Sequence, residues 1–148
     1  MSANKYDALK LEGQLCFPLY AASRETIKLY KPFLDKIDLT YTQYIAMMVL
    51  WERKTVTVKE MGELLFLDSG TLTPLLKKME QKGLLTRTRS VTDERSLNIQ
   101  VTEKGEELKD AALHIPYEMA KCVQLENEEV LALYKTLYKM LGRPRKID

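Results

Sequence analysis

The segment of residues 67–102 constrains the fold most, because it predicts a helix followed directly by a β-hairpin. Asp68 and Ser69 open such a helix, since a short side-chain oxygen accepts hydrogen bonds from the unpaired amides of the first turn. Leucine and methionine then recur at helical spacing until Gly83, a residue type that commonly ends helices. Residues 84–89 and 96–101 alternate apolar and polar side chains, as half-buried strands do, on either side of a charged tip.

The polar side chains of this segment suit duplex DNA. The helix leaves hydroxyl and ammonium donors on its outer faces, which fit a major groove, and arginines in the hairpin can reach phosphates or an adjacent minor groove. Asp93 lies two residues from Arg95 and can pair with its guanidinium. On residue types alone, an ordinary domain with a solvated basic face is the alternative. The candidate DNA-binding residues are Ser69, Thr71, Thr73, Lys77, Arg87, Asp93 and Arg95.

The net charge of the chain is too small to explain DNA binding by overall electrostatic attraction. The chain has 148 residues, enough for one domain, and a net charge of only +2. Local charge must therefore make the site, and residues 69–95 supply six lysines and arginines against three acidic residues. The chain lacks an apolar run long enough to span a bilayer and the apolar core of a signal peptide. We therefore expect a cytoplasmic protein with no membrane partner, and two distant cysteines predict no structural disulfide framework.

The residues before this segment complete a winged helix-turn-helix. A long helix is expected over 6–30, with Pro18 kinking or restarting it, a break at Pro32 and a short helix to residue 37. Thr40 or Thr42 opens a helix to residue 52 that is the most apolar segment and the expected core. A brief strand follows at 55–56, and Thr57 caps a helix over 58–65. Helix, turn, helix and hairpin, in that order, predict a winged helix-turn-helix.

The two ends of the chain predict a homodimer. The first helix has a wide apolar surface, and after residue 102 a helix to about residue 122, interrupted near Pro116, precedes a last helix over 128–141 that Asn127 caps. We interpret residues 5–40 and 103–148 as dimerisation helices around a DNA-binding region over 41–102, all within a single domain over 1–148. The predicted fold class is mainly α (α+β). A two-fold dimer places two recognition helices on successive major grooves.

Cys16 lies on the apolar stripe of the first predicted helix. A lone cysteine in that position is ordinarily a buried small hydrophobe, and no Lys, Arg or His within four residues activates this thiol. Tyr30 follows 14 residues later, about 21 Å along a continuous helix at 1.5 Å per residue. It therefore cannot touch its own Cys16, but it can reach the Cys16 of a partner if the two first helices run antiparallel.

Three stretches together resemble the organic-hydroperoxide-responsive (OhrR-like) branch of the multiple-antibiotic-resistance regulator (MarR) family. They are LEGQLCFPLYAASRETIKLYKPFLDKIDLTYTQYIAMMVLWE, LDSGTLTPLLKKMEQKGL and DERS, and the resemblance covers roughly residues 11–141. It implies a repressor dimer on a palindromic operator in double-stranded DNA, which is released when an organic hydroperoxide oxidises the N-terminal cysteine to a sulfenate.

The resemblance also implies roles for individual residues. Cys16 would be the sensing residue, Tyr30 and Tyr41 would hydrogen-bond its thiolate from the other subunit, and Tyr20 would be a nearby pocket residue. Ser69, Thr71, Thr73 and Lys77 resemble recognition-helix contacts, and Asp93 with Arg95 resembles the pair at the wing tip.

Two residues depart from the family's pattern. Pro18 replaces an ordinary helix former beside Cys16. Cys122 lies in the region where some relatives carry a resolving thiol, while other relatives form mixed disulfides with small thiols. The surroundings of Cys122 match no motif, so an incidental cysteine at a helix end is the alternative.

Two other functions stay open from the residues. One is a regulator of the same fold that responds to a phenolic ligand or has a broader redox or virulence role. The other is a thiol peroxidase, which the absence of a CxxC motif and of an arginine beside Cys16 disfavours. We therefore expect no enzyme, no cofactor and no metal site, since His114 is the only histidine and has no nearby carboxylate or thiol in the sequence.

Overall fold

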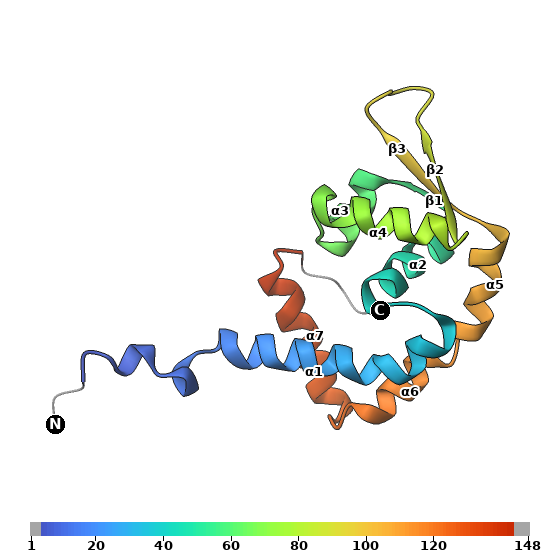
Figure 1. Ribbon diagram of the computed structural model, residues 1–148. Coiled ribbons are helices and arrows are strands. Elements are labelled where there is room, and N and C mark those ends of the chain that lie inside the picture. The colour runs from blue at the N-terminus through green and yellow to red at the C-terminus, as the bar shows by residue number, and fades with distance from the viewer. Residues whose placement is uncertain (1–3, 144–148) are drawn as a thin grey trace. The chain divides into compact units, whose positions relative to one another are not determined.

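Helices make up most of the structure, and one small antiparallel sheet completes it (Figure 1). The structure is a computed structural model that describes residues 4–143. It divides into two compact units, one ending at Ile115 and the other beginning at Pro116. The predicted fold class, mainly α with a winged helix-turn-helix, is confirmed. The predicted dimerisation segment 103–148 spans both units, and its role stays a prediction.

The first helix differs from its prediction at both ends. Two short 3-10 turns, η1 (Asp7–Leu9) and η2 (Leu11–Gly13), precede α1 (Cys16–Leu34). The helix starts at Cys16, so Pro18 lies in the first turn, where its missing amide has no partner within the helix and no kink results. The predicted break at Pro32 is wrong, because α1 continues through this proline and passes directly into η3 (Asp35–Ile37).

The core forms around α2 (Tyr41–Arg53), as predicted. Of the two candidates, Thr40 is the capping residue: its hydroxyl accepts from the amide of Gln43, and the Gln43 side chain accepts from the amide of Thr40. The apolar side chains of this helix lie at the centre of the first unit. Those that are buried are Tyr44, Ala46, Met47, Leu50 and Trp51.

The helix-turn-helix follows the predicted boundaries closely. Strand β1 (Thr55–Thr57) leads into α3 (Val58–Leu65), which Thr57 caps together with Glu60. The turn to α4 (Ser69–Gln81) is tight: a β-carbon on Gly62 would lie 2.6 Å from the carbonyl oxygen of Leu67. Only glycine therefore lets the two helices approach this closely at that point.

The sheet has the order β1–β3–β2, so β2 is an edge strand. Gly83, with a φ of +75°, ends α4 as predicted and turns the chain into β2 (Leu85–Arg89). Strand β3 (Leu97–Val101) pairs with β1 and β2, and Arg87 lies opposite Ile99. One face of the sheet packs on the core through Val56, Leu85 and Ile99.

The first helix after the sheet is interrupted earlier than the predicted position near Pro116. Thr102 caps α5 (Glu103–Ala112), and the interruption before α6 (Ile115–Cys122) falls at Leu113 and His114. In the second unit, α7 (Asn127–Met140) is capped by Glu126 instead of Asn127, because the Glu126 and Glu129 side chains form a reciprocal capping box. Among the residues that the structure describes, no helix is long and apolar enough to cross a membrane.

Candidate functional site

Helix α4 presents the side chains that were predicted to contact DNA. The Asp68 carboxylate accepts from the amide of Thr71 at 2.7 Å, and this bond holds the pKa of Asp68 below its usual value. The buried face of α4 is formed by Leu72, Leu76 and Met79. The opposite faces expose the predicted residues Ser69, Thr71, Thr73 and Lys77. The Thr73 hydroxyl donates to the carbonyl oxygen of Ser69 at 2.8 Å, so its oxygen keeps acceptor capacity for a base edge.

The hairpin between β2 and β3 carries its charges at an exposed tip. The amide of Ser90 donates to the carbonyl oxygen of Ser96 at 2.8 Å and closes the tip. Asp93 accepts from the backbone amide of Arg95 at 3.0 Å, and no ion pair joins this carboxylate to the Arg95 guanidinium within the described part of the chain. The predicted pairing of the two side chains is therefore wrong for this structure, because Asp93 shapes the turn and leaves the guanidinium exposed.

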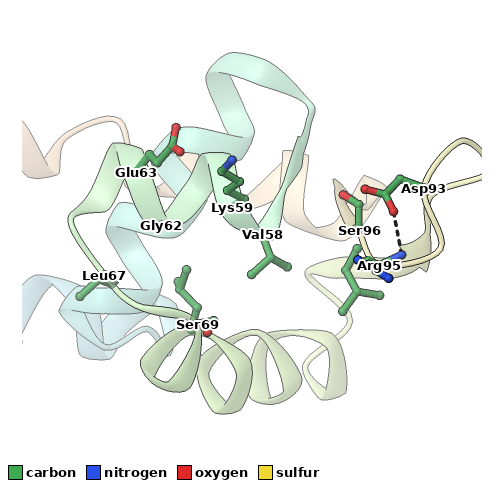
Figure 2. A pocket seen from close by; sticks show the side chains of 11 residues that line it. Val58, Lys59, Gly62, Glu63, Leu67, Ser69, Asp93, Arg95 and Ser96 are labelled. Atoms are coloured by element: carbon green, nitrogen blue, oxygen red, sulfur yellow. Dashed lines mark hydrogen bonds between the residues drawn. The ribbon is translucent and has the colours of Figure 1, made fainter.

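A cleft of about 530 Å³ separates the start of α4 from the hairpin tip. Figure 2 shows Ser69 on one side of it, Asp93, Arg95 and Ser96 on the other, and Val58 of α3 between them. The cleft thus lies between the predicted DNA contacts on α4 and those on the hairpin. A recognition helix and a wing separated in this way can lie in a major groove and against the neighbouring phosphates at the same time.

Arg87 does not share the exposure of the other predicted contacts. Its guanidinium donates to Glu80 of α4 through Nε at 3.3 Å and Nη2 at 3.1 Å, and its side chain is only 20% exposed. The sequence pattern placed Arg87 correctly on the hairpin, but it gave no sign of this partner seven residues earlier. The structure thus brings together Ser69, Asp93 and Arg95 around one cleft and turns Arg87 toward the protein.

Cys16 is exposed at the first residue of α1, not buried on a helix stripe. Amides without helical partners gather in this first turn and favour a negatively charged group there. Tyr20 follows one turn later, and its hydroxyl accepts from Nη1 of Arg24 at 3.1 Å. Sequence reasoning missed Arg24 because it lies eight residues from the cysteine, although two helical turns bring it to the same side.

A cluster of three tyrosines lies at the far end of α1. The rings of Tyr30 and Tyr41 are 4.9 Å apart, and Tyr44, expected only as a core residue, lies 5.9 Å from Tyr30. Since α1 is continuous from Cys16 to Leu34, Tyr30 lies about 21 Å along the axis from Cys16 of the same chain. The structure therefore separates the predicted sensing cysteine from two of its three predicted tyrosine neighbours within one chain.

Burial and the neighbouring phenols Tyr41 and Tyr44 raise the pKa of Tyr30 to about 12. We expect the Tyr30 phenol to stay protonated, and so able to donate, throughout the physiological range. Because the unfolded chain releases this proton near pH 10, the contribution of Tyr30 to stability is constant below pH 10 and is lost as the pH rises through about 12. The difference in phenolate absorbance between the wild type and Tyr30→Phe, titrated with base, should have its midpoint near 12; a midpoint near 10 would contradict this.

Two further residues considered in the sequence are Cys122 and His114. Cys122 is exposed at the end of α6 and belongs to the second unit, while Cys16 belongs to the first. The His114 ring packs edge-on against Phe33 at 6.3 Å. Among residues 4–143, no cluster of three or more His, Cys, Asp and Glu side chains is arranged to hold a metal ion.

Comparisons with known proteins agree with this architecture. Residues 28–112 match the family described as transcriptional regulator SarA/Rot. The chain is 55% identical over 138 residues to the organic hydroperoxide resistance transcriptional regulator of Bacillus subtilis, covering 93% of this chain and 94% of that protein. It is 40% identical over 133 residues to the regulator SarZ of Staphylococcus aureus, covering 90% of each chain.

Solved structures of similar regulators include complexes with DNA. Reduced AbfR bound to DNA has 33% identity and a TM-score of 0.77, covering 93% of this chain and 96% of that one. AbfR has also been solved in an overoxidised form bound to DNA and in a disulfide form, with TM-scores of 0.73 and 0.64. The predicted resemblance to organic-hydroperoxide-responsive regulators is confirmed. This chain belongs to the SarA/Rot family of winged-helix transcriptional regulators.

Proposed function

We propose that this chain is a homodimeric repressor that binds a palindromic operator and releases it when an organic hydroperoxide oxidises Cys16. The observation that carries the proposal is the 55% identity, over nearly the whole chain, to an organic hydroperoxide resistance regulator. The exposed α4 face, the cleft and the Arg95 tip supply a DNA-binding surface, and the exposed Cys16 supplies a thiol that a peroxide can reach.

The chemistry at Cys16 is a two-electron oxidation of sulfur. The thiolate attacks the terminal oxygen of the hydroperoxide, an S–O bond forms, the O–O bond breaks, and the alkoxide leaves and takes up a proton to become an alcohol. The sulfur becomes a sulfenic acid. In a second step this acid condenses with another thiol to give a disulfide and water.

The disulfide formed in the second step is our candidate for the oxidised form that releases the operator. Overoxidised AbfR was solved bound to DNA, so in that relative the addition of oxygen to sulfur is compatible with a DNA complex. A disulfide constrains backbone positions far more than added oxygen atoms do. We therefore assign release to a disulfide of Cys16, formed with Cys122 of a partner or with a small thiol.

The second copy completes the sensor site in this proposal. The exposed apolar side chains of α1 favour an interface with another chain. They include Phe17, Leu19, Ile27 and Leu29, and Leu15, directly before the helix, is exposed as well. Because Tyr30 lies about 21 Å from Cys16 of its own chain, the cysteine that meets the tyrosine cluster would be the Cys16 of the partner subunit. The Tyr30 and Tyr41 phenols would then donate hydrogen bonds to that thiolate.

A mixed dimer tests this arrangement across the interface. We expect Tyr30→Phe with Tyr41→Phe to slow oxidation of Cys16 roughly tenfold, because two donors to the thiolate are lost. A mixed dimer of this double variant with a Cys16→Ser chain should regain the wild-type rate, since its one cysteine faces intact tyrosines. The rate is measured by trapping sulfenic acid with a dimedone reagent. A mixed dimer as slow as the double variant would contradict the arrangement.

Binding to the DNA upstream of the protein's own gene tests the function as a whole. The reduced protein should shift this fragment at low salt, cumene hydroperoxide should abolish the shift, and a reductant should restore it. Salicylate and other phenolates are the comparison, because release by these compounds alone would favour the ligand-responsive alternative. Failure of the reduced protein to bind would overturn the proposed function.

A further inference from the structure

An acidic side chain occupies an unexpected place on the recognition helix. Glu80 lies in the last turns of α4, only one turn beyond the DNA-facing residue Lys77. A carboxylate close to a DNA-binding surface opposes the phosphates and should weaken binding by its charge. We therefore looked for a favourable contribution of Glu80 to DNA binding that outweighs this repulsion between its carboxylate and the phosphates.

The contacts of Glu80 run to the hairpin. One carboxylate oxygen accepts from the backbone amide of Arg87 at 2.9 Å, and the other accepts from Nε and Nη2 of the same residue. Both oxygens are therefore engaged by one residue of the edge strand β2. The bond to the backbone amide holds the strand itself, not only a side chain, because that amide is not paired with β3.

The hairpin beyond this point has little other support. From Thr88 to Arg95 every side chain except that of Ser90 is exposed. The position of the tip relative to α4 therefore depends on how β2 is held at its base. The guanidinium of Arg87 also holds the pKa of Glu80 below its usual value, so the carboxylate stays charged at neutral pH.

We propose that Glu80 and Arg87 form a brace that positions the hairpin relative to α4, and that Arg87 serves DNA binding through this position instead of by contacting a phosphate. The inference rests on the proposed function, since it concerns the operator complex. It has an unusual consequence: Glu80 strengthens operator binding in spite of its negative charge.

Glu80→Gln gives opposite results under the two roles of Arg87, whereas Arg87→Gln weakens binding under both. If the brace operates, Glu80→Gln and Arg87→Gln each weaken operator binding, roughly tenfold for a lost charged hydrogen bond. The double variant should be no weaker than either single one, because the same interaction is lost in all three. If Arg87 contacts a phosphate, Glu80→Gln should tighten binding by freeing the guanidinium. Glu94→Gln, which removes a negative charge from the exposed tip, is the matched control and should bind as the wild type or more tightly.

One further readout separates positioning from simple stability. The cost of Arg95→Ala should be large in the wild type and small in the Glu80→Gln background, where the tip is no longer held in place. A pair that only stabilised the fold would leave the cost of Arg95→Ala unchanged.

The proposal fails if Glu80→Gln tightens binding or if the cost of Arg95→Ala is equal in both backgrounds. Amide hydrogen exchange tests the brace without DNA. Exchange in β2 should accelerate in Glu80→Gln while exchange in α4 stays constant, and unchanged exchange in β2 would overturn the brace. If the wild type binds no operator, the proposed function fails, but the hydrogen exchange measurement still tests whether Glu80 and Arg87 hold the hairpin in place.

Discussion

Replacing Cys16 by serine is expected to leave operator binding by the reduced protein intact and to abolish its release by cumene hydroperoxide. Serine keeps the size of the side chain at the start of α1, where Cys16 is exposed and supports no core packing. It cannot form a sulfenic acid or a disulfide. We expect the wild type to lose operator affinity by roughly 5- to 150-fold on oxidation, the usual range of coupling between two sites, and the variant to lose none.

The control for this prediction is Cys122→Ser. If Cys122 is the resolving thiol, a non-reducing gel of the oxidised wild type shows a covalent dimer that is lost in either cysteine variant. If a small thiol resolves the sulfenic acid, Cys122→Ser releases operator normally once that thiol is supplied. Normal release by Cys16→Ser would remove Cys16 from the mechanism.

Replacing Gly105 by alanine is expected to lower the stability of the fold strongly. A β-carbon at this position would overlap the carbonyl oxygen of Leu84 and would lie 2.8 Å from a methyl group of Val101. The Gly105 carbonyl oxygen also accepts from Nε1 of the buried Trp51 at 2.8 Å. The first turn of α5 must move to relieve the overlap, and that movement strains the bond to Trp51.

We expect Gly105→Ala to lower the free energy of unfolding by roughly 2–4 kcal/mol, the sum of overpacking and a weakened buried hydrogen bond. Urea denaturation at one fixed protein concentration measures it, since a dimer's stability depends on concentration. Gly13→Ala is the matched control, because no atom lies within 4 Å of its added β-carbon and its φ is not positive. A loss below about 0.5 kcal/mol for Gly105→Ala, the usual range of surface changes, would contradict the packing described above.

Local sequence signals predicted the centre of the molecule well. Thr57 and Asp68 were recognisable as helix caps, and Gly83 as a helix end, because each acts through backbone groups within a few residues. The apolar run in α2 predicted the core for the same reason, since its composition alone demands burial. These features needed no knowledge of contacts distant in sequence.

Prolines were harder to interpret, because their effect depends on their position within a helix. Pro18 is harmless in the first turn of α1, where its amide would have no partner. Pro32 is accommodated two residues before the last residue of the helix, where the chain continues directly into η3. Sequence spacing alone does not fix where a helix starts, so it could not distinguish a helix-starting proline from a kink.

The site residues that were misjudged are those with partners outside their own turn. Arg87 and Glu80 are seven residues apart on different elements, so only the fold shows that they pair. The Asp93 carboxylate has two possible partners on Arg95, and its bond to the backbone amide leaves the guanidinium exposed. Tyr44 joins the tyrosine cluster because α1 and α2 pack together, which no local pattern reports.

The central claim is that oxidation of Cys16 controls operator binding, and a single titration tests it most directly. Increasing amounts of cumene hydroperoxide are added to the reduced protein on a fluorescent operator. The same samples are read by fluorescence anisotropy and by mass spectrometry of the peptide that contains Cys16. Operator release should rise in proportion to the fraction of Cys16 converted to a disulfide. Release while Cys16 stays reduced, or full conversion of Cys16 to a disulfide with the operator still bound, would contradict this account.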